Sequence, residues 1–249
     1  MVLAAGKGTR LQEAGADVAA LPKPLLPLGG KAVLEHNLEL CRRHGVREVA
    51  INLHWRPELV REFVGDGGRW GLRVVYSFEA QLLGTAGGVK RLAEFFGDAD
   101  FVVIYGDNYT DCDLGALVSR HRDTGALATV AVFDTRAGRY SGIAGSRVLL
   151  SEDDCIVGFE ETRGAEGRFE SPWTNAGVYA LNPAVLDLIP EGRECDFGRD
   201  VFPQLLSQPG RLRAYRHPGF CFGMDTPEAY RTAQERVGEL TAPSITRLE

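Results

Sequence analysis

A chain of 249 residues, with 44% hydrophobic and 25% charged residues, has the composition of a globular α/β protein built as one large domain or two small ones. Its formal net charge of −6 excludes a general attraction to nucleic acid or to an anionic membrane, so any phosphate must meet a local cluster of donors. No apolar run is long enough to span a bilayer.

The first half of the sequence alternates short apolar runs with amphipathic stretches, which is typical of βα units on a mostly parallel sheet. The apolar runs predict strands at Val2–Ala4, Val49–Leu53, Arg73–Ser77, Phe101–Tyr105 and Ala128–Phe133. Helical spacing between them predicts helices over Lys31–His44, Pro57–Val64, Gly88–Phe96 and Leu114–Arg122. The predicted fold is therefore a Rossmann-like, mostly parallel mixed sheet flanked by helices.

The pattern changes after about Asp134, where Gly- and Glu-rich loops separate shorter strands. Strands are predicted at Arg147–Leu150, Ile156–Glu160 and Gly177–Leu181, and helices at Ala184–Ile189, Arg199–Leu206 and Pro227–Leu240. We predict a single domain over residues 1–240. It has a lobe over 1–134, a smaller mixed β lobe over 135–240, and a tail over 241–249.

The five cysteines are scattered and lack the close paired spacing of a zinc site or a disulfide framework. They are typical of reduced thiols in a cytosolic protein. The first residues run too quickly into Lys7 and Arg10 to form a signal peptide. We therefore predict a cytoplasmic protein that has no membrane or nucleic-acid partner.

A glycine loop begins where the first predicted strand ends, at the edge where α/β sheets bind ligands. Its sequence is Leu3-Ala4-Ala5-Gly6-Lys7-Gly8-Thr9-Arg10-Leu11. Gly6 and Gly8 let backbone N–H groups turn toward phosphate oxygens, and Arg10 adds a fork of donors. A triphosphate fits such a loop, whereas the simpler interpretation of a lone Gly-x-Gly is a tight turn.

Lys23 lies between Pro22 and Pro24, which hold it in a stiff, extended segment. A lysine held in this way is placed to neutralise the charge that grows on an α-phosphate while pyrophosphate is displaced. The alternative is a solvated lysine between two turn-forming prolines.

Together, the glycine loop and the Pro-Lys-Pro segment resemble the signature of the sugar-phosphate nucleotidyltransferase family, including its mannose-1-phosphate and manno-heptose-1-phosphate guanylyltransferases. In that family the loop wraps the nucleotide phosphates, and the lysine contacts phosphate at the reacting centre. The resemblance implies catalytic roles for Arg10 and Lys23. It implies nucleotide binding by Ala4, Ala5, Gly6, Lys7, Gly8, Thr9 and Arg10.

A second glycine-rich segment, residues 79–88, lies after a predicted strand and before a predicted helix. In the family this segment helps to recognise the base. The motif Leu-Gly-Thr-Ala-Gly is most similar to that of the enzymes that use GTP. The resemblance implies base or nucleotide contacts from Gln81, Gly84, Thr85, Ala86 and Gly87. A glycine-rich connection that merely leads into a helix is the structural alternative.

Asp107 follows an apolar strand, and a carboxylate in that position suits Mg²⁺ that bridges protein and triphosphate. A turn or cap aspartate is the alternative. Asp225 matches the second metal-binding aspartate of the family, ahead of a late helix, although it also suits a cap before Pro227. We therefore predict a Mg²⁺ site on Asp107 and Asp225.

The resemblance also implies sugar-binding residues, with a departure beside one of them. The implied residues are Asn108, Glu161, Asn175 and Gly177. After Glu161 the usual lysine and proline are replaced by Thr162 and Arg163, and that lysine normally meets the phosphate of the sugar 1-phosphate. Arg163 or Arg168 is a candidate to bind the same anion.

The family resemblance implies a reaction between a nucleoside triphosphate and a sugar 1-phosphate that yields a nucleotide sugar and pyrophosphate. GTP with mannose 1-phosphate or manno-heptose 1-phosphate is the expected pair, and a homodimer is the candidate assembly. Three alternatives stay open. The first is a cytidylyl- or uridylyltransferase that acts on another sugar or on a non-sugar phosphate. The second is a non-catalytic regulatory subunit that binds a nucleotide sugar. The third and weakest is a dinucleotide-binding oxidoreductase, because the fingerprint of that class has a third glycine that this loop lacks.

Overall fold

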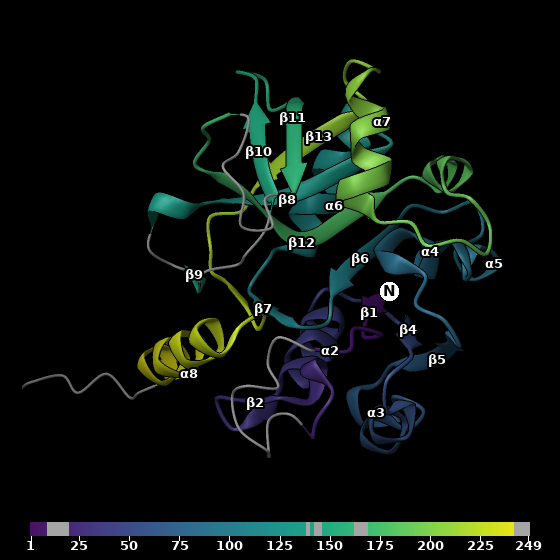
Figure 1. Ribbon diagram of the computed structural model, residues 1–249, viewed down its shortest axis with the longest axis vertical. Helices are drawn as coiled ribbons and strands as arrows, with labels where there is room; N and C mark the ends of the chain where they lie inside the picture. Colours follow the sequence, from purple (N-terminus) through teal and green to yellow (C-terminus); the bar gives the residue numbers. More distant parts are fainter. Residues whose placement is uncertain (9–19, 138–139, 142–145, 162–168, 242–249) are drawn as a thin grey trace, which may run out of the picture.

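The computed structural model describes residues 1–8, 20–137, 140–141, 146–161 and 169–241. Within them, one mixed sheet has the strand order β11-β10-β12-β6-β1-β4-β5, and β8 and β13 extend it from β12 (Figure 1). The strands are β1 (Val2–Leu3), β4 (Glu48–Leu53), β5 (Arg73–Phe78), β6 (Phe101–Tyr105), β8 (Ala128–Asp134), β10 (Ser146–Leu150), β11 (Ile156–Glu161), β12 (Trp173–Leu181) and β13 (Leu212–Arg216). Strands from both sides of residue 134 therefore share one sheet, and the boundary between two lobes stays a prediction.

The strand order reverses at β1. The chain adds β4 and then β5 in parallel on one side of β1, and it places β6 in parallel on the other side. Leu3 at the end of β1 is in register with both Asn52 and Tyr105. Ligands of open α/β sheets bind in the crevice at such a reversal, beyond the carboxyl ends of the strands.

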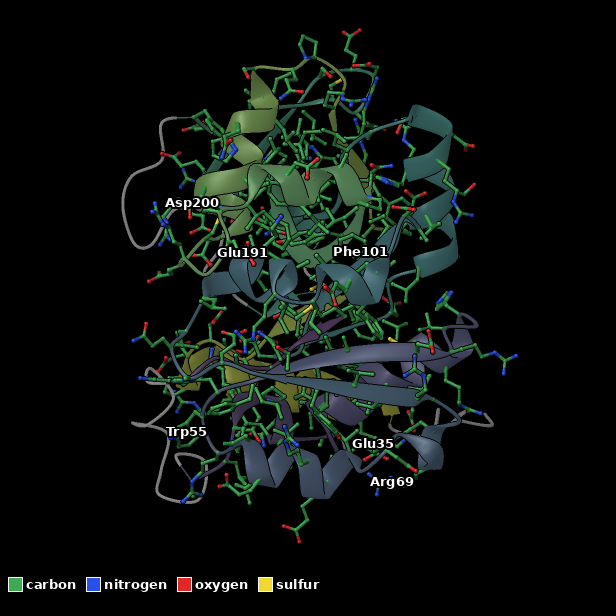
Figure 2. The ribbon with its side chains drawn as sticks, turned by 90° about the vertical axis from the view of Figure 1, so that its right-hand side faces the viewer. Glu35, Trp55, Arg69, Phe101, Glu191 and Asp200 are labelled. Carbon is green, nitrogen blue, oxygen red and sulfur yellow. The ribbon has the colours of Figure 1, made fainter. Side chains whose placement is uncertain are left out.

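Helices cover both faces of this sheet. Alternate residues of each strand point to opposite faces, and apolar residues on both faces are buried against these helices. Val49, Ile51 and Leu53 pack with α2 (Val33–Arg43), α3 (Pro57–Val64) and α6 (Leu114–Thr124). Ala50 belongs instead to a core cluster that also contains residues of α4 (Gly84–Lys90), α5 (Ala93–Phe96) and α7 (Phe202–Leu206). In Figure 2, Glu35 and Arg69 mark the first side, and Glu191 and Asp200 mark the second. The predicted fold class is confirmed.

Two small sheets hold the end of the chain against its beginning. One has the order β7-β14-β9, from Asn108–Thr110, Cys221–Gly223 and Tyr140–Ser141. The other pairs β2 (Pro27–Leu28) with β3 (Lys31–Ala32). Helix α8 (Pro227–Thr241) packs beside them (Figure 1), and the Tyr230 hydroxyl donates to the carbonyl of Pro27 at 2.7 Å.

Several predicted elements differ from the observed ones. The predicted helix over Gly88–Phe96 is two helices, α4 and α5, and the first begins four residues earlier, at Gly84. The predicted helix over Arg199–Leu206 begins as a π-helix at Phe197 (Phe197–Val201), and the one at Ala184–Ile189 is a 3₁₀ helix over Pro183–Leu188. Strands β7, β13 and β14 were not predicted, because runs of three to five residues leave little periodicity.

The described residues show all five cysteines as free thiols, four of them buried. Among the helices that the structure describes, none is long and apolar enough to cross a membrane.

Candidate active site

A cavity of about 550 Å³ opens at the carboxyl ends of β1, β4, β5 and β6. It is lined by most of the described residues that the sequence predicted for the site: Ala4, Ala5, Gly6, Lys7, Gly8, Lys23, Gly84, Thr85, Asp107, Asn108, Glu161, Asn175, Gly177 and Asp225. Thr9 and Arg10 lie outside the described residues, as do Thr162, Arg163 and Arg168. The fold therefore gathers residues that are spread over more than 200 positions into one cavity.

The glycine loop leaves β1 and turns into the cavity. The Ala4 amide donates to Oδ1 of Asn52 at 2.8 Å, which fixes the start of the loop to the end of β4. Gly8 has a φ of +62°, and a Cβ atom on it would lie 2.9 Å from Cγ of Lys23. Glycine is required at position 8 both for this backbone conformation and for the contact with the lysine stem.

Lys23 lies at the centre of the polar part of the cavity. The prediction of an extended segment was wrong, because Lys23 begins a 3₁₀ turn, Lys23–Leu25, in which Pro24 suits the first turn. Lys23 is only 9% exposed. Its Nζ donates to Oδ2 of Asp107 at 3.2 Å and to Oδ1 of Asp225 at 2.9 Å. Burial opposes the charged ammonium, but the two carboxylates outweigh it and raise the pKa of Lys23 above its ordinary value.

Two aspartates converge on Lys23 because of the pairing between β7 and β14. Asn108 is in register with Gly223, so the residues beside these two positions lie close together. The carbonyl of Asp107 accepts from the Met224 amide at 3.1 Å. A Cβ atom on Gly106 would lie 2.6 Å from the Leu3 carbonyl, so only glycine lets Asp107 follow β6 so close to β1.

Segment 79–87 forms another wall of the cavity. Glu79, at the end of β5, is 1% exposed; its Oε1 accepts from Nδ2 of Asn52 at 2.8 Å and its Oε2 from the Leu83 amide at 3.0 Å. Gly84 and Thr85 also line the cavity, whereas Gln81 is exposed and lies outside the lining. The buried carboxylate of Glu79 therefore lines this wall, and the nucleotide contact of Gln81 stays a prediction.

Ala86 and Gly87 were also predicted to contact the nucleotide. Both are buried outside the cavity lining, and their amides donate to the Cys195 carbonyl at 2.9 and 3.0 Å. A Cβ atom on Gly87 would lie 2.7 Å from the Arg193 carbonyl. These two residues hold segment 193–195 against the cavity wall.

The lining of the cavity also includes the residues that were predicted for the sugar. Nδ2 of Asn175 donates to the Tyr179 hydroxyl at 2.7 Å, and Oδ1 accepts from the Gly177 amide at 2.9 Å. Nδ2 of Asn108 donates to the Ala176 carbonyl at 3.0 Å. Both amides therefore shape the irregular middle of β12, where Gly177 has a φ of +68°.

A sequence comparison decides the family. The family model described as nucleotidyl transferase matches residues 1–236.

The chain belongs to the nucleotidyl transferase family.

Known relatives of this nucleotidyl transferase agree with that assignment. The UTP–glucose-1-phosphate uridylyltransferase of Synechocystis sp. is 37% identical over 218 residues, which cover 83% of this chain and 54% of the relative. The mannose-1-phosphate guanylyltransferase of Mycobacterium tuberculosis is 32% identical over 248 residues, covering 98% of this chain and 66% of the relative. This chain thus spans less than two thirds of the length of both relatives.

A solved structure shares the fold of this nucleotidyl transferase. It is a candidate glucose-1-phosphate thymidylyltransferase from Bacillus anthracis in complex with a sucrose. The TM-score is 0.82 at 20% identity, covering 97% of this chain and 96% of the other. The family resemblance seen in the sequence motifs is confirmed.

Nucleotidyl transferases of this family generally use a divalent metal. The structure offers two carboxylates, Asp107 and Asp225, that already share one cation, the Lys23 ammonium. Within the described residues no group of three or more His, Cys, Asp or Glu side chains is arranged to hold a metal ion. A pair of carboxylates nevertheless fits Mg²⁺, which takes one or two carboxylates and completes its shell with phosphate oxygens and water.

Sequence reasoning missed several residues that line the cavity of this nucleotidyl transferase: Asn52, Glu79, Leu82, Tyr105, Ser146, Glu194 and Asp196. Asn52, Glu79 and Tyr105 lie at or just after the ends of β4, β5 and β6, so their positions relative to the strands could have pointed to them. Glu194 and Asp196 come from a distant segment, and no local pattern places them here.

Proposed function

We propose that this chain transfers a nucleotidyl group from a nucleoside triphosphate to a sugar 1-phosphate and releases pyrophosphate. The observation that carries the proposal is the convergence of Lys23, Asp107 and Asp225 beside the glycine loop, at the point where the strand order reverses. Membership of the family, and relatives that are named for this type of transfer, support it.

In the proposed reaction an oxygen of the acceptor phosphate attacks the α-phosphorus of the triphosphate. A new P–O bond forms, and the bond from the α-phosphorus to the bridging oxygen breaks as pyrophosphate takes the electron pair. The attacking oxygen is already ionised, so the chain needs no general base and no covalent intermediate. Its task is to hold two mutually repelling anions in line and to offset their charge.

Each described element has a role in that task. Backbone N–H groups of the loop at Gly6 and Gly8, with Lys7, face the triphosphate, and Lys23 offsets charge at the α-phosphate. We also assign Arg10 to the phosphates. Asp107 and Asp225 would hold Mg²⁺, which when bound supplies positive charge to the phosphate oxygens.

We propose GTP as the donor because of the buried carboxylate at the base wall. A carboxylate has about four acceptor sites, and Glu79 uses one oxygen for Asn52 and the other for Leu83. One further acceptor site is left on each oxygen. Guanine presents two adjacent N–H donors that match such a pair, whereas uracil presents one. The M. tuberculosis relative is named a guanylyltransferase.

A second candidate donor is UTP, with glucose 1-phosphate as acceptor. It is favoured by the name of the Synechocystis relative, which is 37% identical to this chain. For GTP we propose an acceptor of the manno series, mannose 1-phosphate or manno-heptose 1-phosphate, bound with help from Glu161, Asn175, Asn108 and Gly177. Arg163 or Arg168 replaces the family lysine at its phosphate, so Arg163→Ala and Arg168→Ala should raise the KM for the acceptor.

The test measures pyrophosphate release by the purified protein with Mg²⁺. Each of the five common nucleoside triphosphates is combined with a panel of sugar 1-phosphates that includes glucose, mannose and manno-heptose. Turnover with one pair establishes the reaction and both substrates. Binding of a triphosphate or a nucleotide sugar without turnover of any sugar or non-sugar phosphate would refute the catalytic proposal and favour a regulatory subunit.

We further propose a cytoplasmic location, supported by the free thiols, and a homodimeric assembly. Cell fractionation tests the first, and light scattering of the purified protein tests the second.

A further inference from the structure

One wall of the cavity is formed where two segments that are distant in the sequence meet. The Cys195 amide donates to the Leu83 carbonyl at 2.8 Å, and the Cys195 carbonyl accepts from the amides of Ala86 and Gly87. Segment 193–197, which we name the clasp, is therefore joined to segment 83–87 through the backbone of both.

The glycines of segment 83–87 make this close approach possible. Gly84 has a φ of +73°, and a Cβ atom on it would lie 2.5 Å from the Cys195 carbonyl oxygen. A Cβ atom on Gly87 would meet the Arg193 carbonyl at 2.7 Å. Side chains at these two positions would push the clasp away. The glycines of this stretch thus serve the contact with the clasp.

Side chains complete the contact at Thr85. Oδ1 of Asp196 accepts from the Thr85 amide at 2.9 Å and from the Thr85 hydroxyl at 3.1 Å. The Phe197 amide donates to the same hydroxyl at 2.9 Å. Hydrogen bonds to a charged acceptor are the stronger kind, so Asp196 is the main polar anchor of Thr85.

Asp196 is itself held in place from its own side. Its Oδ2 pairs with Nη1 of Arg199 at 3.2 Å, and its amide donates to Oδ2 of Asp200 at 2.8 Å. Thr85 and Asp196 both line the cavity, and the Asp196 side chain is 14% exposed. The carboxylate therefore lies between the wall formed by segment 79–87 and a clasp that is fixed by the start of a helix.

We propose that Asp196 is a positioning residue of the nucleotide site. It fixes Thr85, and through Thr85 it holds segment 79–87 in the shape that binds the base and the triphosphate. Asp196 does not touch the reacting atoms. Nucleotide affinity therefore depends on a residue of the clasp, more than 100 positions away in the sequence. This inference rests on the proposed function, because it assumes that segment 79–87 binds the nucleotide.

A double-mutant cycle tests this role. The Kd of an unreactive GTP analogue with an α,β-methylene bridge is measured by calorimetry for the wild type, Asp196→Ala, Thr85→Val and the double variant, with the UTP analogue in parallel. Asp196→Ala should raise the Kd about 10-fold, the loss expected for hydrogen bonds to a charged group. In the Thr85→Val background the same change should have a much smaller effect, about threefold, because one of its two bonds is already absent.

Matched variants separate positioning from general damage. Asp200→Asn removes the negative charge beside Arg199 but keeps an oxygen that can accept from the Asp196 amide, and it does not touch Thr85, so it should change the Kd by no more than about twofold. Asp196→Asn keeps an acceptor oxygen for Thr85 and should restore the Kd to within about twofold of the wild type. In turnover assays Asp196→Ala should raise the KM for the triphosphate far more than it lowers kcat.

Two outcomes overturn the proposal: a wild-type Kd in folded Asp196→Ala, or effects of the two single variants that simply multiply. If Asp196→Ala does not fold, the Kd values of Thr85→Val and of Thr85→Ser, which keeps the hydroxyl, still test whether the Thr85 contact matters. An unchanged Kd in Thr85→Val sinks the idea. A wild type that binds the analogue but never turns over any acceptor refutes the proposed reaction and leaves this cycle interpretable.

Discussion

Nζ of Lys23 lies 2.9 Å from Oδ1 of Asp225, although 202 positions separate the two residues in the sequence. The same Nζ also pairs with Asp107, so a single ammonium serves both carboxylates. Lys23 therefore neutralises the pair that would hold a divalent ion, and the ion and the ammonium compete for the same oxygens.

Lys23→Met should have two opposite effects. Turnover should fall about 100-fold or more, because a charge aimed at the reacting phosphate is lost. The affinity of the nucleotide-free protein for Mn²⁺ should rise, because Asp107 and Asp225 lose the cation that they share. Kinetics and electron paramagnetic resonance of Mn²⁺ measure the two effects. Equal or weaker Mn²⁺ binding by the variant would contradict the competition.

Glu79→Gln should weaken selection for GTP. The variant loses one of the carboxylate oxygens and places an amide donor against the donors of guanine, so kcat/KM for GTP should fall about 10-fold or more relative to UTP. Gln81→Ala is the matched comparison, since Gln81 is exposed outside the cavity lining, and its preference should stay that of the wild type. A loss of selectivity in Gln81→Ala, with none in Glu79→Gln, would instead support the predicted contact between Gln81 and the base.

Gly84→Ala should destabilise the fold more than Gly97→Ala does. Both glycines have positive φ, at 73° and 57°, but a Cβ atom on Gly97 would meet no atom within 4 Å. Backbone strain alone should cost about 1 kcal/mol at position 97, and the clash with Cys195 should bring the cost at position 84 to about 3 kcal/mol. Urea unfolding measures the free energy of each variant. Equal losses of unfolding free energy in the two variants would show that the clasp moves away from position 84 at no energetic cost.

Asp111→Asn should lower stability at pH 7 by at most about 1 kcal/mol, because water screens a carboxylate that is 44% exposed, and it should have less effect at pH 3. Burial opposes the charged form of Asp111, but hydrogen bonds from His217 and the Phe220 amide outweigh it and hold the pKa below its ordinary value of 3.8. A lowered folded-state pKa gives stability that is present above 3.8 and fades as the pH falls through the folded value. Urea titrations at both pH values test this, and a difference that grows toward pH 3 would contradict it.

The parallel half of the fold could be predicted from the sequence because its strands are continuous apolar runs. The strand Phe101–Tyr105 and the helix Pro57–Val64 have the predicted bounds, since each has an apolar pattern that a glycine follows. Strands β7 and β14 could not be found in this way. Each has three residues, and their pairing joins Asn108 to Gly223, a contact that no local pattern reveals.

The candidate site shows the same division. Lys23 and Asp107 could be named in advance because each lies in a local pattern that has a chemical reason for its residue type, and Asp225 because it matches the motif of the family. Glu79 was missed and Gln81 was chosen because an irregular loop has no periodicity to show which side chains turn inward. Asp196 was missed because its bonds to Thr85 depend on folding across 111 positions.

The pairing of β14 with β7 also sets the order in which a growing chain acquires its parts. The glycine loop, Lys23 and Asp107 are all synthesised before residue 108, but the second carboxylate, Asp225, follows more than 100 residues later. A nascent chain can therefore fold its parallel strands and shape the glycine loop well before it carries both carboxylates. The two carboxylates that share the Lys23 ammonium therefore come together only after the parallel part of the sheet has been synthesised.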